Sequence, residues 1–229
     1  MTAKKTYSGK DSMAGLVLEN INMLFVLSRF GIPMGFGEST IDEVCRQNGV
    51  DTPTFLAVVN LNLQDGPSRS LPNGNLKPEA ITEYLHNAHE YFLQYRFPII
   101  KERLREAMND KDRADVSVVV LRFFDEYIAE VKKHMAYEEK NVFPHVRNLL
   151  QGKADNYQIS VFSKRHDQIE SRLNELRDIL IKYYKGATGH AFNAVLFDIF
   201  TCAEDLREHN EVEDALLVPL IEQLEKQAR

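Results

Sequence analysis

A repeated pattern of histidine, glutamate and proline limits how this chain can fold more than any other feature of its sequence. In each copy a glutamate follows a histidine by four residues, and a proline follows the glutamate by six. The copies are His134, Glu138 and Pro144, and His209, Glu213 and Pro219. Residues four apart lie on one face of an α-helix, about one turn from each other. Each copy therefore predicts a helix that presents an imidazole beside a carboxylate.

The repeat extends upstream, because one more histidine precedes each copy at nearly the same distance. His89 lies 45 residues before His134, and His166 lies 43 residues before His209. Two helix pairs with this pattern, packed antiparallel, would point four imidazoles and two carboxylates into one bundle interior, as in carboxylate-bridged metal pairs. A ligand set of nitrogen and oxygen favours iron or manganese over a thiolate zinc site.

Alternatives to this interpretation come from the same residues. A single His-x3-Glu pair is usually a solvated pair of neighbours on a surface helix. A second alternative is a helical bundle whose histidines are satisfied core residues without metal. The presence of two matching copies makes both alternatives less favourable than a metal site. His86 competes with His89 for the first helix, since residues three apart point about 60° apart around the axis; we favour His89. Glu130 and Asp205, one turn before the repeated histidines, are candidates for hydrogen bonds to the ligands.

Composition and periodicity favour an all-α protein. The 229 residues include only 8 prolines and 11 glycines, with 44% hydrophobic and 27% charged residues, which suits helices in a folded globular chain. Start and stop signals predict four long helices, which span about 78–108, 114–150, 156–184 and 192–226. Joined by short connections, they predict an up-down-up-down four-helix bundle with kinks at Pro98, Pro144 and Pro219.

A stretch rich in Pro, Gly, Asn and Ser over residues 64–75 predicts a connection between two parts of the chain. We expect a small helical N-terminal module over 1–68, a linker over 69–77 and the bundle over 78–229. Within the module, helices are expected at about 16–29, 41–47 and 52–62, with a turn at 31–37.

Charge and cysteine content argue against several function classes. The net charge of −6 and the pI near 5.7 offer no basic stripe for nucleic acid. No uninterrupted apolar run approaches the roughly 18 residues of a membrane span. Cys45 and Cys202 lie far apart and lack a CxxC partner, which predicts neither a disulfide framework nor a thiolate metal site and fits a reducing cytoplasm.

Taken together, the motifs resemble the hemerythrin-like di-iron proteins of the RIC (repair of iron centres) family. The resemblance rests on His134-Met-Ala-Tyr-Glu-Glu-Lys-Asn-Val-Phe-Pro144, His166-Asp167 and His209-x3-Glu213-x5-Pro219, and it covers nearly the whole chain. It implies two non-haem irons joined by an oxo or hydroxo group, with Glu138 and Glu213 as bridging carboxylates. The implied ligands are His89, His134, Glu138, His166, His209 and Glu213.

The N-terminal module also resembles that of the family, with one departure. The similar positions are Leu24-Phe25, Ile32, Gly37 and Thr40-Ile41-x-Glu43-x-Cys45. Where the family's module carries adjacent cysteines before a glycine, this chain has Gly35-Phe36 before Gly37. The thiol chemistry of that cysteine pair therefore does not carry over to this chain.

The resemblance implies a stress protein that handles O2, NO or peroxide during nitrosative or oxidative damage and helps to repair iron–sulfur clusters. Damaged iron–sulfur proteins would then be its partners. The alternative is a module that binds or senses O2 or NO reversibly without repairing anything. Whether the chain is an enzyme stays open, and a homodimer is compatible with both interpretations.

Overall fold

The structure is a computed structural model that describes residues 5–63, 75–108, 114–153, 156–162, 167–184 and 189–227. Over these residues it contains helices and no strand, apart from one isolated bridge between Ser12 and Thr40. The all-α prediction is confirmed. Most of the expected linker, residues 69–77, lies outside the described residues. None of the described helices combines the length and the hydropathy that a bilayer span requires.

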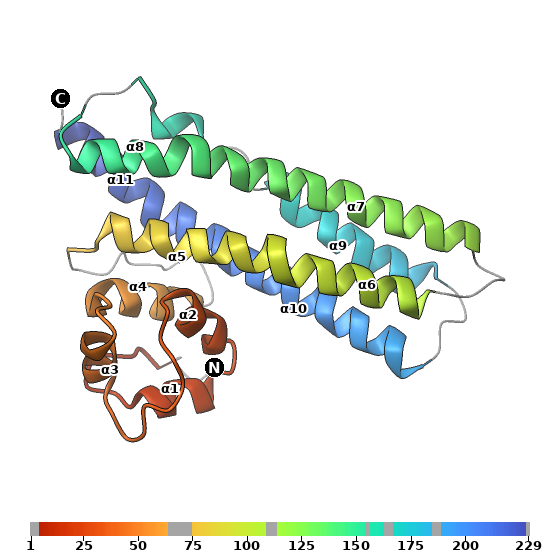
Figure 1. The fold of residues 1–229 in the computed structure, drawn as a ribbon, viewed down its shortest axis with the longest axis horizontal. Helices are drawn as coiled ribbons and strands as arrows, with labels where there is room; N and C mark the ends of the chain where they lie inside the picture. Colours follow the sequence, from red (N-terminus) through yellow and green to blue (C-terminus); the bar gives the residue numbers. More distant parts are fainter. Residues whose placement is uncertain are drawn as a thin grey trace. The chain divides into compact units, whose positions relative to one another are not determined.

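Four long helices form the predicted up-down-up-down bundle (Figure 1). Three of them consist of an α-helix, a wide π-helical turn and a second α-helix. These are α5 (Pro78–Glu90), η1 (Tyr91–Arg96) and α6 (Phe97–Ala107); α7 (Ala114–Tyr137), η3 (Glu138–Val142) and α8 (Phe143–Leu150); and α10 (His190–Val212), η5 (Glu213–Leu217) and α11 (Val218–Gln227). The remaining bundle helix is α9 (Asp167–Lys182).

The third bundle helix begins later than predicted. We expected a helix from about residue 156, but Gln158 has an extended backbone with φ −133° and ψ 129°, and a short 3-10 turn, η4 (Ile159–Val161), follows it. Ile159 and Phe162 are fully buried. This segment therefore supplies side chains to the core without being part of the long helix.

Each π-helical turn precedes a proline, and the proline explains the turn. Pro98, Pro144 and Pro219 are the second residues of α6, α8 and α11. A proline has no N–H for the carbonyl four residues before it, and its ring collides with that carbonyl. Widening the turn to i→i+5 hydrogen bonds relieves the conflict without ending the helix. The predicted kinks are thus wide turns within continuous helices.

The chain divides into two compact units that cut across the long helices, one comprising residues 89–144 and 157–210 and the other residues 1–88, 145–156 and 211–229. In the first unit α7 packs on α6 and α9. Ion pairs join its helices, from Lys101 to Asp125, from Arg172 to Glu130 and from Arg96 to Asp198. A cluster of aromatic rings fills its core, made by Phe92, Phe97, Phe124 and Tyr127.

The second unit contains the N-terminal helices α1 (Met13–Glu19), α2 (Met23–Arg29), α3 (Ile41–Gln47) and α4 (Thr52–Leu63). The single helix expected at 16–29 is two helices, because Asn20 ends α1 with its backbone N–H and its side-chain amide both donating to the Leu16 carbonyl. Helix α3 has a capping box between Thr40 and Glu43.

Within the same unit, the end of α2 packs on the first half of α5. The Asn87 amide donates to the Arg29 carbonyl at 2.8 Å, and the Arg29 guanidinium approaches the Tyr84 hydroxyl at 3.4 Å. The rings of Phe30 and Tyr84 lie 4.9 Å apart. The N-terminal helices thus contact the bundle helix that carries His89 at its end.

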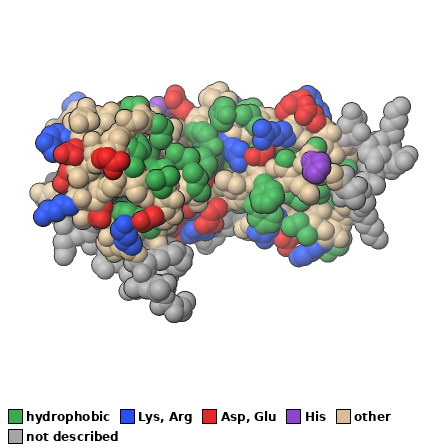
Figure 2. Space-filling model, turned by 90° about the horizontal axis from the view of Figure 1, so that it is seen from below, with side chains coloured by type: hydrophobic (Ala, Val, Ile, Leu, Met, Phe, Trp, Pro, Cys, Tyr) green, Lys and Arg blue, Asp and Glu red, His purple; other side chains and the backbone are tan. Residues whose placement is uncertain are grey.

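Charged side chains of both signs are interspersed on the face drawn in Figure 2. Among the described residues, some exposed charged side chains form short-range pairs along one helix, such as Lys182 with Asp178 and Arg207 with Glu204. Exposed pairs of this kind contribute about 0–1 kcal/mol each. The buried apolar residues therefore dominate the stability of the fold.

Candidate metal centre

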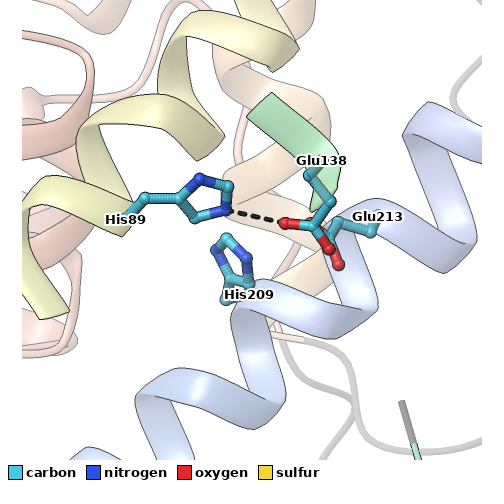
Figure 3. Close-up of side chains that lie close together, drawn as sticks. All are labelled: His89, Glu138, His209 and Glu213. Atoms are coloured by element: carbon cyan, nitrogen blue, oxygen red, sulfur yellow. Dashed lines mark ion pairs between the residues drawn. The ribbon is translucent and has the colours of Figure 1, made fainter. Parts of the chain in front are cut away.

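Four buried side chains from three bundle helices meet at one point (Figure 3). They are His89 near the end of α5, Glu138 at the start of η3, His209 on α10 and Glu213 at the start of η5. Each offers one ligand atom, and these atoms all lie within 4.8 Å of one another. Their relative exposures are 3%, 0%, 1% and 0% in that order.

The Glu138 carboxylate lies between imidazoles from two different helices. Its Oε2 is 2.9 Å from Nε2 of His89, the contact dashed in Figure 3, and its Oε1 is 2.7 Å from Nε2 of His134. Both are contact distances between an imidazole nitrogen and a carboxylate oxygen. A carboxylate that offers one oxygen to each of two imidazole sites has the arrangement that a bridging metal ligand requires.

Glu139 orients the imidazole of His89 from the other side. Its Oε1 lies 2.8 Å from Nδ1 of His89. An ionised carboxylate can only accept, so Nδ1 carries the proton and donates it. In a neutral imidazole this leaves the lone pair of Nε2 facing the Glu138 oxygen, and two lone pairs repel each other. A second ring proton or a cation at Nε2 removes that repulsion, and metal-bound histidines commonly show this carboxylate contact.

Sequence reasoning did not find Glu139. It proposed Glu130 and Asp205 as the acids that hydrogen-bond the ligands. Glu130 instead pairs with Arg172 of α9 at 3.0 Å, and Asp205 is buried on α10. The doubled glutamate at 138–139 was the available signal, but its meaning depends on a histidine 50 residues away.

Aromatic rings surround the imidazoles and keep water away from them. Phe143 stacks on His89 with ring centroids 5.5 Å apart, and Phe162 stacks on His134 at 6.0 Å. Phe92 and His209 form a T-shaped pair with ring centroids 5.9 Å apart. Polar groups interact more strongly in such a dry environment than in water.

The local sequence explains how the two glutamates reach the centre. Glu138 and Glu213 are the first residues of η3 and η5, six residues before the prolines that cause those wide turns. Each glutamate still lies one α-helical turn after its histidine, so the pair shares a face. The wide turns, with roughly one extra residue each, begin at the glutamates, so the four-residue spacing from each histidine stays α-helical.

The structure brings together five of the six predicted ligands. Four form the cluster, and His134 joins it through Glu138. His166 lies outside the described residues. His86, the competitor of His89, is exposed. His145 is buried on α8 and pairs with Glu225 of α11 at 2.9 Å.

The residues fit a metal cation on electrostatic grounds. Glu138 and Glu213 are both fully buried and have carboxylate oxygens within 4.8 Å of each other. Two adjacent carboxylates cannot both stay ionised in a dry interior unless positive charge compensates them. Imidazole nitrogens and carboxylate oxygens are donors that suit iron and manganese.

Comparison with known proteins agrees with the donor set. Residues 80–221 match the family described as Hemerythrin HHE cation binding domain. The match covers more than half of the chain and includes every predicted ligand. Among curated proteins, none matches this sequence. On the extent of the family match and the buried cluster of histidines and glutamates, the chain belongs to the hemerythrin HHE cation-binding family.

Proposed function

We propose that the chain holds a pair of non-haem iron ions, with manganese as the alternative metal. The proposed ligands are His89, His134, Glu138, His166, His209 and Glu213, with the two glutamates as bridges. The observation that carries the proposal is the position of Glu138, fully buried between Nε2 of His89 and Nε2 of His134. Carboxylate-bridged metal pairs in helical bundles use this combination of residues.

The chain's own residues would prepare the site in three ways. The histidines and glutamates supply the donors, Glu139 fixes the ring of His89, and the stacked phenylalanines exclude bulk water. A bound iron pair would supply reversible one-electron chemistry and open positions for O2, NO or peroxide.

We propose a role in nitrosative and oxidative stress, in the repair of damaged iron–sulfur clusters through iron or NO handling. The support is the resemblance to the RIC family along nearly the whole chain. The cytoplasm, where the two free cysteines would stay reduced, is the proposed location. Damaged iron–sulfur proteins are the proposed partners, and a homodimer is compatible with this role.

A reversible O2 or NO binding or sensing module without repair activity is the second candidate, and the N-terminal module favours it. Gly35, which stands where the family has a cysteine, has φ +99°, a conformation that a cysteine would rarely adopt. Cys45 is the one thiol between residues 1 and 68, and burial raises its pKa to about 12. Such a thiol is inert as a nucleophile.

Metal analysis, an anaerobic NO titration and a repair assay together test the proposal. Protein purified after iron-replete expression should contain about two irons per chain, as expected for a bridged pair. Reactivation of a cluster enzyme that NO has damaged would support repair. Tight, reversible NO binding without reactivation would support the sensing module. Protein without metal would contradict both.

A further inference from the structure

A chain of aromatic rings leads from the ligand His209 towards the protein surface. The ring centroids of Phe92 and His209 lie 5.9 Å apart, those of Tyr91 and Phe92 5.6 Å apart, and those of Tyr91 and Tyr95 5.7 Å apart. These centroid separations are those of rings in direct contact. Each ring between His209 and Tyr95 is therefore in direct contact with the next ring.

The chain of rings runs from the dry interior to solvent. Phe92 is fully buried, Tyr91 is half-buried and Tyr95 is 58% exposed. All three belong to the π-helical turn η1. Arg96, the last residue of that turn, is fixed to α10 by bonds to the side chain and the carbonyl of Asp198 at 3.0 and 2.9 Å. The turn is thereby held on the helix that carries His209.

A second series of ring contacts leads from Phe92 to a buried tyrosine and can be compared with the series that leads to Tyr95. Phe92 stacks on Phe97 at 5.8 Å, and Phe97 meets Tyr127 at 5.8 Å. Tyr127 is fully buried, so an external reductant cannot reach its ring. Only the Tyr95 branch, among these ring contacts, connects His209 with solvent.

We propose that Tyr91 and Tyr95 carry an electron from the protein surface to the His209 side of the metal centre when peroxide is reduced there. This inference rests on the iron pair of the proposed function. Phenols suit the task because a tyrosine can lose one electron together with its hydroxyl proton. Phe92 serves as the contact between Tyr91 and the ligand.

The electron path supplies what a half-oxidised iron pair lacks. Reduction of one H2O2 to two waters breaks the O–O bond and consumes two electrons and two protons. A bound iron pair with one reducing equivalent left would supply only one of these electrons. Tyr95 gives the second electron and its hydroxyl proton, and solvent gives the other proton. The neutral tyrosyl radical left at the exposed Tyr95 is then reduced by a one-electron donor such as ascorbate.

The test uses the full iron-loaded chain, poised with one reducing equivalent per iron pair and mixed with one equivalent of H2O2. Freeze-quenched electron paramagnetic resonance detects tyrosyl radicals, and peptide mass spectrometry locates oxidised tyrosines. The wild-type protein should give a radical and oxidation at Tyr95. Tyr95→Phe should lose the Tyr95 product, and the double variant Tyr91→Phe/Tyr95→Phe should lose the radical signal.

Two controls separate a path through the protein from attack by a diffusing oxidant. Tyr127→Phe should keep the radical signal. Tyr183 is 71% exposed, more than Tyr95, and should stay unoxidised. Oxidation of Tyr183 to the same extent as Tyr95, or an undiminished signal in the double variant, would overturn the proposal.

Iron content, measured first in every sample, distinguishes the two levels of failure. None of the substituted tyrosines is a proposed ligand, so all variants should bind as much iron as the wild type. Iron at the expected stoichiometry with no signal that depends on Tyr91 and Tyr95 would overturn the electron path alone. A chain that binds no iron would overturn the proposed function and the path with it.

Discussion

Glu138 is the residue on which the proposed centre depends most. Its carboxylate is fully buried and touches imidazoles of two helices. Glu138→Ala should lose most of the bound metal, because it removes a bridge and leaves two histidines without their shared partner. His86→Ala should lose little, since His86 is exposed three residues before His89. Metal analysis of both variants checks this, and equal losses would contradict His89, rather than His86, as the ligand from the first bundle helix.

Glu139 gives a more selective prediction at the same scale. Glu139→Gln replaces the acceptor for Nδ1 of His89 by an amide, which weakens the orientation and basicity of the ring. We expect iron affinity to fall by about 10- to 100-fold, measured by competition with a chelator. Glu225→Gln is the matched control, because it alters a carboxylate at 2.9 Å from His145, a buried histidine outside the cluster. A similar loss in both variants would contradict a specific role for Glu139.

Contacts within one helix could be predicted from sequence spacing, whereas contacts between helices could not, because they depend on how the helices pack. His134 and Glu138 lie on one helix turn, so their pairing follows from their separation in the sequence. The contact of Glu139 with His89 joins two helices, and no local pattern encodes it. For the same reason Glu130 was a plausible partner by spacing and yet pairs with Arg172.

At the scale of elements, the prolines shape the helices that carry the site. Pro144→Ala restores an N–H to a helix whose wide turn η3 compensates for its absence. We expect η3 to relax towards an α-helix, rotating Glu138 relative to α8 and lowering iron affinity without loss of helix content. Chelator competition and circular dichroism measure the two effects.

Pro53→Ala is the control for this change, because Pro53 lies in the first turn of α4, where a proline N–H is not needed. Its iron affinity should match the wild type. An unchanged affinity in Pro144→Ala would show that the wide turn does not position Glu138.

We expect the stability of the N-terminal helices to depend on pH through Asp51. Burial by itself would raise the pKa of the Asp51 carboxyl. Hydrogen bonds from the side chain and backbone of Thr54, together with Lys77, outweigh burial and lower the pKa below its usual value. The stabilisation is therefore complete above the unfolded pKa of about 3.9 and is lost as the pH falls through the lower folded pKa.

Asp51→Ala should lower the free energy of unfolding at neutral pH by about 1 kcal/mol, the usual value of a helix N-cap. The difference from the wild type should shrink below about pH 4. Urea unfolding at pH 7 and at pH 3 measures it. A difference that stays constant over this range would show that the charge of Asp51 contributes nothing.

The bounds of a helix could be predicted where a long apolar pattern defines the helix. They could not be predicted where a single residue interrupts the pattern. The first, second and fourth bundle helices follow their expected spans, because apolar periodicity extends over many turns. The split of the expected helix 16–29 depends on Asn20 competing for the Leu16 carbonyl. The late start of the third helix depends on the extended backbone at Gln158, which has no signal in composition.

At the scale of the whole molecule, metal bound at the proposed centre should stabilise the folded state, because the proposed ligands come from separate helices that are close only when the bundle is folded. A ligand that binds only the native state adds about 2.7 kcal/mol at 100 times its dissociation constant. Cys202 on α10 and Cys45 on α3 are both buried, so each thiol reacts with a labelling reagent only after opening of its region.

Labelling of Cys202 in a Cys45→Ser variant should therefore slow by about 100-fold when iron is bound at that excess. Removing the iron with a chelator should restore the faster rate. The same measurement in Glu138→Ala should show little difference between iron-treated and chelator-treated protein, because the bridge that couples binding to folding is gone. Equal protection by iron in Glu138→Ala and in the parent would place the stabilising ion elsewhere in the chain and contradict the proposed centre.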